Sequence, residues 1–357
     1  MRVWLTFLFG VMSVNLLCAV ASEDASAADL KLGAVQVPVA DRSSEARAEA
    51  LSMGIDQVLV RLTGSRELGA IDGLGPIRSQ PSRWAQQFSY TQLADDQLGL
   101  NVNFDLNAVL GALERSGAPV WGVTRPQILV WLALQRPGYG EIVGRDMSDP
   151  VALALSSAAQ ERGLPLVMPL MDDKDRGTIN VADIRGHFDN VIQQASARYQ
   201  APVRVSAVIY TGARPQIRWR LFRGTEILDQ GEFTADDEPL AVRRLVDEIA
   251  DRLASVYVIK SGSGEAQVLT VSGVRKLGDW SALQQYLQKL TGVSGVNMLQ
   301  VKGEQVRFSL MFSGSLDQLT RMLALYPGLA PCPVGAADLN SEVSAPVALP
   351  AYCWQGG

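Results

Sequence analysis

Three carboxylates crowd the segment DDKDRGTIN, residues 172–180, directly after a predicted strand. Asp172, Asp173 and Asp175 have the density of a calcium-binding loop. When the segment is aligned on Gly177 as the turn glycine, two of the three preceding ligand positions are cations, which oppose calcium binding. We therefore expect a solvated, locally salt-bridged loop. It remains a candidate interaction surface, because ligands commonly bind where the strands of α/β sheets end.

A second candidate interaction surface is rich in arginine. Arg204, Arg218 and Arg220 alternate with apolar residues along two neighbouring predicted strands, so that one face carries arginine and the other is apolar. A solvated outer face is the simpler interpretation. The alternative is a surface that binds an anionic partner, such as a cell-wall polymer.

Nucleophilic and metal chemistry have little support in the sequence. The chain contains one histidine, His187, whereas zinc sites of the H-E-x-x-H type need two, and no G-x-S-x-G elbow is present for a serine nucleophile. We therefore predict no catalytic residue, no cofactor-binding residue and no metal ligand. The enzymatic alternative is a hydrolase that uses carboxylates alone, with Asp172, Asp173 and Asp175 as its acids. Their cationic neighbours would keep these groups ionised, which disfavours a proton donor.

Two of the three cysteines, Cys332 and Cys353, flank a Pro- and Ala-rich segment at the end of the chain. An isolated cysteine pair in an exported protein favours a disulfide, and a loop of this length is worth about 3 kcal/mol. A redox or metal pair would have C-x-x-C spacing or nearby histidines. Four prolines between 331 and 350 make a helix or a central strand unexpected, so the sequence predicts an irregular tail tied by the disulfide.

Residues 1–21 have the pattern of a cleaved signal peptide: one arginine, an apolar run, and the small residues Ala19 and Ala21 before an acidic segment. The alternative is an inner-membrane anchor formed by residues 3–21, since about 20 apolar residues can cross a bilayer. Beyond this run no apolar stretch is long enough to span a membrane. We therefore expect a soluble protein in the periplasm of a Gram-negative cell.

Residues 28–122 predict a first α/β module. Apolar residues alternate over 30–39 as in a half-buried strand. A helix is expected to begin near Ser43 and to end at Gly64, with its apolar residues on one face. The further elements expected are a short helix near 84–88, a strand at 98–104 and a helix at 106–115.

Residues 123–260 predict a second α/β module. The continuous apolar run 128–134 suits a strand covered on both faces. Strand and helix alternate until three consecutive strands with short turns indicate an antiparallel meander. The elements expected after the first strand are a helix at 149–162, a second buried strand at 164–171, a long helix near 182–199, the meander strands at 203–210, 215–223 and 226–233, and a helix over 239–256.

A flexible Ser-Gly linker over 261–264 precedes a third module. Residues 265–330 predict the order β-α-β-β-α, which belongs to split βαβ, ferredoxin-like modules. The predicted fold class is therefore a multi-domain mixture of α/β and α+β: three small α/β modules, the last ferredoxin-like, and a disulfide-tied C-terminal tail, residues 331–357. The similar segments RLTGS (61–65) and KLTGVSG (289–295) are interpreted as two helix ends that use glycine.

Four stretches resemble an uncharacterised proteobacterial family of exported proteins, a domain of unknown function. They are RAEALSMGIDQVLVRLTGS (47–65), LPLVMPLMDDKDRG (164–177), ASARYQAPVRVSAVIY (195–210) and VSGVRKLGDWSALQQYLQKLTGVSGV (271–296). The resemblance covers most of the chain beyond the leader and implies neither an activity nor catalytic residues. Separately, the element order of 123–260 is similar to the amino-terminal domain of the Tol-Pal component TolB and to the middle domain of a flagellar-ring accessory protein.

These observations predict a non-catalytic binding or scaffold factor of the cell envelope. Its expected partner is an envelope protein or a cell-wall polymer. Nucleic acid is not an expected partner, because the formal net charge of −5 comes without any basic block that could follow a phosphate backbone.

Overall fold

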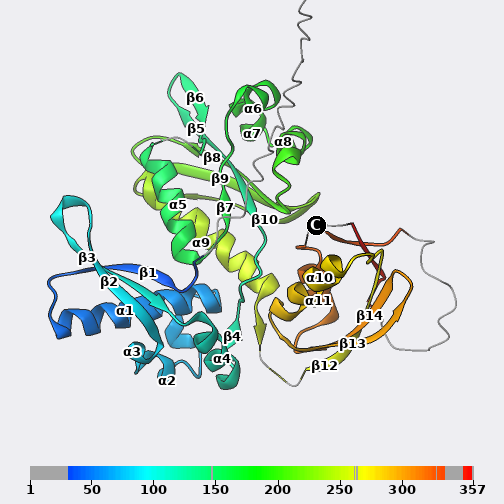
Figure 1. The fold of residues 1–357 in the computed structure, drawn as a ribbon. Coiled ribbons are helices and arrows are strands. Elements are labelled where there is room, and N and C mark those ends of the chain that lie inside the picture. The colour runs from blue at the N-terminus through cyan, green and yellow to red at the C-terminus, as the bar shows by residue number, and fades with distance from the viewer. Residues whose placement is uncertain are drawn as a thin grey trace, which may run out of the picture.

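The computed structural model describes residues 31–145, 148–260, 262, 264–326, 328–333 and 349–355. Over these residues the chain forms 11 helices, three short 3-10 turns and four β-sheets, arranged as three small modules that meet at their centre (Figure 1). The predicted fold class, a mixture of α/β modules, is confirmed. The predicted signal peptide (1–21), the alternative anchor (3–21) and most of the tail lie outside the described residues.

The N-terminal module, β1 to α4, is a three-stranded antiparallel sheet in the order β1-β3-β2, with α1 on one face. Ser43 caps α1 by accepting the amide N–H of Ala46, and Gly64 ends the helix at φ 74°, as the sequence predicts. Ile55 and Leu59 of α1 are fully buried against the sheet. The elements are β1 (Ala34–Val39), α1 (Ser44–Thr63), η1 (Leu68–Ala70), α2 (Gly75–Arg78), α3 (Pro81–Trp84), β2 (Ala85–Gln92), η2 (Ala94–Asp96), β3 (Leu98–Phe104) and α4 (Leu106–Ser116).

The prediction of a short helix near 84–88 is wrong for the residues after Trp84. Helix α3 ends there, and the chain continues as the edge strand β2. The Trp84 indole donates to the Ile77 carbonyl at 3.0 Å, and the Trp84 carbonyl accepts the amide of Asp105 at 2.7 Å. These bonds fix Trp84 as the point where the chain changes direction.

The central module, β5 to α9, has three layers. Its sheet runs β10-β9-β8-β5-β6, and β7 pairs with β5. Helices α5 and α9 cover one face, and α7 and α8 cover the other (Figure 1). The elements are β5 (Ile128–Arg136), β6 (Tyr139–Ile142), α5 (Pro150–Arg162), β7 (Leu166–Val167), α6 (Asp173–Thr178), α7 (Val181–Arg185), α8 (Asp189–Ser196), η3 (Ala197–Tyr199), β8 (Val203–Tyr210), β9 (Gln216–Arg223), β10 (Glu226–Thr234) and α9 (Glu238–Tyr257).

Two expectations for this module are confirmed. Every residue from Ile128 to Leu134 is fully buried, because Val130 packs toward α5 and α9 while Trp131 packs toward α8. Each such buried aliphatic side chain stabilises the fold by about 1.5–3 kcal/mol. Strands β8, β9 and β10 form the expected antiparallel meander.

Two other expectations are wrong. The strand expected at 164–171 pairs only over Leu166–Val167, since Pro165 and Pro169 have no N–H for a ladder. The long helix expected near 182–199 is split into α7 and α8. His187 lies between them with φ 54°, which a continuous helix does not allow.

The C-terminal module, β12 to β16, is a five-stranded sheet in the order β13-β14-β12-β16-β15, with α10 and α11 packed on its apolar side chains. Its core is continuous with that of the central module through Val256, Tyr257 and Ile259. The elements are β12 (Glu265–Ser272), α10 (Leu277–Lys289), β13 (Val293–Lys302), β14 (Gln305–Phe312), α11 (Leu316–Leu323), β15 (Leu329–Pro331) and β16 (Tyr352–Trp354).

The expectation of a wholly irregular tail is wrong for residues 352–354. Strand β16 lies between β12 and β15, parallel to the first and antiparallel to the second. Tyr352 is fully buried, and Trp354 stacks on Tyr326 with 5.4 Å between ring centroids. The prolines fall outside these three residues, so nothing prevents an inner strand. The predicted Cys332–Cys353 disulfide is confirmed and joins the residue after β15 to the middle residue of β16, with 5.0 Å between the Cα atoms.

None of the helices within the described ranges is long and apolar enough to cross a membrane.

Candidate functional site

The acidic segment is a helical turn, not the expected solvated loop. Asp172 caps α6 by accepting the amide of Asp175 at 3.0 Å, and it binds both terminal nitrogens of Arg198 at 2.7 and 2.8 Å. This bidentate pair holds the pKa of Asp172 well below its usual range. Asp173 is exposed and lies 3.8 Å from Arg176.

Asp175 is the buried member of the acidic set, with 1 % of its surface exposed. It accepts hydrogen bonds from the Tyr199 hydroxyl at 2.5 Å, the Met171 amide at 3.0 Å and Arg198 at 3.1 Å. Burial, followed by the bond to Asp175, raises the pKa of Tyr199 to about 12. Asp172 and Asp175 therefore fasten α6 to η3.

Part of the predicted arginine face lies against α8, whereas Arg218 stays partly open to solvent. Arg204 is 9 % exposed and donates to the Gly224 carbonyl at 2.6 Å. The expectation of a solvated side chain is therefore wrong for Arg204. Arg220 pairs with Asp189 at 3.2 Å, and Arg218 pairs with Glu232 at 3.4 Å. The acidic and basic sets lie near opposite ends of α8, since Asp189 begins that helix and Arg198 follows its end.

The contacts that join the three modules form a different site, which we call the hub. It comprises the two-stranded sheet of β4 (Pro119–Val120) and β11 (Ile259–Lys260), the C-terminal ends of α1, α5 and α9, and the arginines Arg61, Arg125 and Arg162. The strand β4 connects the first two modules and β11 connects the last two, so the two connectors pair with each other. The Trp121 amide continues this contact by donating to the Leu62 carbonyl at 2.6 Å.

Arg125 is the centre of the hub. Its guanidinium donates to five carbonyl oxygens, at distances of 2.5 to 3.3 Å, and stacks 4.2 Å from the centre of the Trp121 ring. The five acceptors are the carbonyls of Arg61, Trp121, Gly122, Arg162 and Gly163. Burial and the neighbouring Arg61 and Arg162 lower the pKa of Arg125 to about 9, so it is charged at neutral pH. A cation there suits the negative C-terminal ends of α1 and α5.

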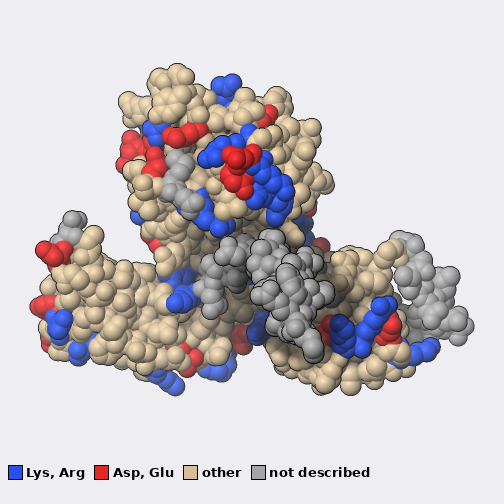
Figure 2. All heavy atoms as spheres, turned by 45° about the horizontal axis from the view of Figure 1, so that its top comes forward, with Lys and Arg blue, Asp and Glu red and all other residues tan. Residues whose placement is uncertain are grey.

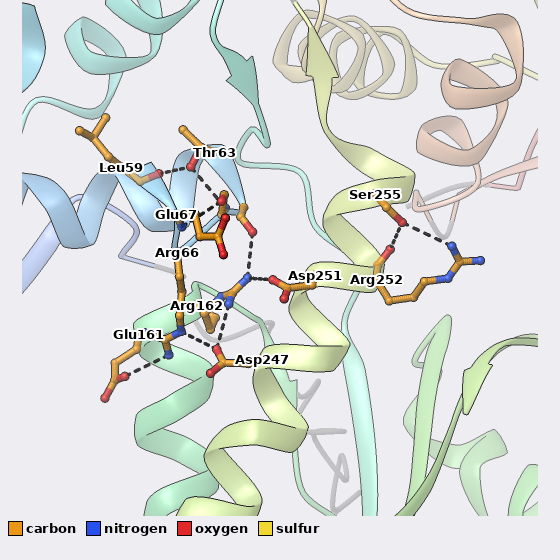
Figure 3. Close-up of polar contacts among 12 residues, drawn as sticks. Leu59, Thr63, Arg66, Glu67, Glu161, Arg162, Asp247, Asp251, Arg252 and Ser255 are labelled. Carbon is orange, nitrogen blue, oxygen red and sulfur yellow. Dashed lines mark hydrogen bonds and ion pairs between the residues drawn. The ribbon is translucent and has the colours of Figure 1, made fainter. Parts of the chain in front are cut away.

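Arg162 links the same helix ends to α9 (Figure 3). Its side chain is 1 % exposed and donates to the Gly64 carbonyl at 2.8 Å, to Asp247 at 2.9 Å and to Asp251 at 2.5 Å. Arg66 donates to Asp247 as well, at 2.6 Å. Arg61 fastens the start of β1 by donating to the carbonyls of Leu32 and Ala34.

Close glycine contacts complete the hub. A Cβ on Gly64, where φ is 74°, would lie 2.6 Å from Ala254 of α9, and a Cβ on Gly122 would lie 1.8 Å from the Thr291 hydroxyl. Gly292 has φ 79° and packs on Ile259 of β11. Both similar segments noted in the sequence, RLTGS and KLTGVSG, are thus helix ends that pack against the connectors. This likeness was the signal in the sequence that could have located the hub.

An open pocket of about 740 Å³ borders the hub and is lined by charges of both signs, including Arg66, Asp247 and Lys260. The Arg125 guanidinium and the two terminal nitrogens of Arg162 are occupied by carbonyl and carboxylate oxygens. In the part of the chain that the structure describes, no group of three or more His, Cys, Asp and Glu side chains is placed to hold a metal ion. The hub is built to hold elements together.

Comparison with known proteins gives one match to a family model, over the first module. The model of a domain of unknown function, DUF8605, matches residues 27–122, which end within the hub at Gly122. No curated protein matches the chain. Among solved structures, protein XCC0632 from Xanthomonas campestris, described by the family model DUF330, aligns at 8% identity and a TM-score of 0.18. The alignment covers 37% of this chain and 84% of that one, and a TM-score this low carries no argument.

Proposed function

We propose that this chain is an exported, non-catalytic binding factor of the cell envelope whose three modules act as one body. The observation that carries the proposal is the hub. Paired connectors and buried arginines hold the three small modules in a fixed arrangement. A fixed arrangement suits a protein that presents preformed binding surfaces to a partner.

Export is supported by two features of different kinds. The first 21 residues have the pattern of a signal peptide, and the disulfide between Cys332 and Cys353 is closed, as is usual in oxidising compartments. The resemblances to a proteobacterial exported family and to the TolB amino-terminal module favour the periplasm and an envelope role. Under this proposal the leader is removed; a retained anchor of residues 3–21 is the alternative.

The arrangement of the carboxylates disfavours the alternative of an envelope hydrolase. A glycosidase needs one carboxyl that holds a proton near neutral pH. Arg198 lowers the pKa of Asp172, Asp175 is buried in its own hydrogen-bond network, and Asp173 is an exposed surface acid. None of the three therefore has the setting of a proton donor: Asp172 and Asp175 are engaged by Arg198, and Asp173 is open to solvent.

In-cell crosslinking followed by mass spectrometry tests the proposal. We expect the chain to be crosslinked to a specific envelope protein or cell-wall fragment, and we expect the Asp173→Asn variant to retain the same product. Asp173 is the suitable position, because its replacement leaves the Arg198 network intact. Loss of a cell-wall cleavage activity in Asp173→Asn, with no crosslinked partner for the wild-type chain, would overturn the proposal in favour of the hydrolase.

A further inference from the structure

Among the described residues, the face of the N-terminal sheet opposite α1 is a surface of side-chain amides and hydroxyls. Helix α1 covers one face of this sheet, and the strand registers place uncharged polar residues in rows across the other. One row is Gln36, Asn101 and Ser89, and the next contains Asn103 and Gln87. We call these five residues the amide platform; all but the half-buried Asn101 are exposed.

The platform forms one wall of a groove whose other wall belongs to the central module. A hollow of about 320 Å³ is lined by the platform, by Gln160 of α5 and by apolar residues of the three strands, among them Phe88. An adjoining hollow of about 450 Å³ is lined by Gln36 and Gln160 again, together with Gln57 and Ser157. Because α1 and α5 are joined at the hub, the hub fixes the width of this groove.

The charge of the groove limits its ligand. None of the residues that line the first hollow is charged, although 19% of the chain is Asp, Glu, Lys or Arg. The second hollow has three charged lining residues: Arg66 pairs with Glu161 at 3.5 Å, and Arg61 is buried and donates to the carbonyls of Leu32 and Ala34. Figure 2 shows a broad neutral area over the N-terminal module, at the left of the view, with charged residues around it. A strongly charged ligand would have no counter-charges on the platform.

The hydrogen-bonding groups match a ligand rich in hydroxyls and amides. Each side-chain amide offers two donors and an acceptor oxygen, so the platform can both give and accept hydrogen bonds along its length. The Gln36 amide already donates to the Asn101 side chain at 2.8 Å, which fixes both groups before a ligand arrives. An apolar ligand would leave these groups unpaired, at a cost.

We propose that the amide platform and its groove bind a neutral glycan chain. The inference rests on the proposed function and names its partner class: a cell-wall polymer with hydroxyl and N-acetyl groups. Rows of the platform repeat along the strands at about 7 Å, so an extended chain lying along the sheet meets successive rows of amides.

The test uses the purified full chain, labelled with 15N, and a soluble tetramer of N-acetylglucosamine as the probe. We expect the side-chain amide resonances of Gln36, Gln87, Asn101 and Asn103 to shift as the tetramer is added. The double variant Gln87→Leu/Asn103→Leu should weaken binding about tenfold, since two amide contacts are lost. Gln230→Leu, an exposed glutamine on the edge strand β10, is the matched control and should bind like the wild type.

The outcomes separate this inference from the proposed function. Shifts outside the groove, no binding, or equal binding by the double variant with an unchanged melting temperature would each overturn the glycan site. If crosslinking in cells then identifies an envelope protein, the proposed function stands and only the partner class is wrong. If an unlabelled sulfated oligosaccharide of the same length binds the groove more tightly than the tetramer, the neutral-ligand argument fails.

Discussion

Replacement of Arg125 by methionine tests the hub at its centre. Methionine keeps an unbranched stem but removes the guanidinium that donates to five carbonyls from the ends of α1 and α5 and from the connector. It also removes the stacking on Trp121 at 4.2 Å. The change therefore loosens the junction without adding volume.

The expected loss of unfolding free energy is about 3 kcal/mol. Each hydrogen bond of this kind contributes about 1 kcal/mol net, and the cation-π contact adds about 1–2 kcal/mol. Methionine carries no charge, so the variant no longer loses the several kcal/mol that burial of the guanidinium costs, and this offsets part of that sum. For a chain of this size the loss corresponds to a melting temperature lower by about 4 °C.

Differential scanning calorimetry measures the effect, with Arg214→Met as the control. Arg214 is exposed in the turn between β8 and β9, so its replacement should leave the melting temperature within about 1 °C. Arg125→Lys should behave nearly like Arg125→Met, because a single ammonium cannot reach the five acceptors. A melting temperature of Arg125→Met equal to that of Arg214→Met would refute this role of Arg125.

Three further predictions concern the hub, the disulfide and the single histidine. Gly64→Ala should destabilise the fold by about 2 kcal/mol more than Gly117→Ala, since both sites have positive φ but only Gly64 faces a side chain at 2.6 Å; equal losses would contradict this packing. Reduction of Cys332–Cys353 should lower unfolding free energy by about 3 kcal/mol in denaturant melts of oxidised and reduced protein, and no difference would show that β16 is held without it. The pKa of His187 should lie below 6.5 by NMR titration, because burial and then Arg220 and Arg218 disfavour its charged form. The contribution of His187 to the free energy of unfolding is then lost as pH falls below 6.5, and His187→Gln should remove this dependence of stability on pH.

Local sequence signals predicted much of the fold. The caps Ser43 and Gly64 mark the ends of α1, and the apolar run from Ile128 to Leu134 indicates the doubly covered strand β5. These features depend on neighbours within a few residues. The short strand β16 was missed because four prolines dominate the tail, although none lies within Tyr352–Trp354.

The sites depended on partners that are distant in sequence. The acids of 172–175 were interpreted from their nearest cations, whereas the decisive partner, Arg198, comes from the other side of α8. The hub was harder still, because Arg125 binds main-chain carbonyls as far away as Arg61 and Gly163, and a carbonyl has no sequence signature. The amide platform appears only when the strand register brings Gln36, Asn101 and Ser89 into one row.

The hub should hold the three modules as one body, and a distribution of distances between two modules measures this directly. Spin labels on cysteines at Glu49 of α1 and Gln288 of α10, both exposed, can be compared by pulsed electron double resonance with Cys18 replaced by serine. We predict one narrow distance peak for the otherwise wild-type chain and a broader one for Arg125→Met. A broad or multiple distribution in the wild-type background would contradict a fixed arrangement, and with it the proposal of a preformed binding body.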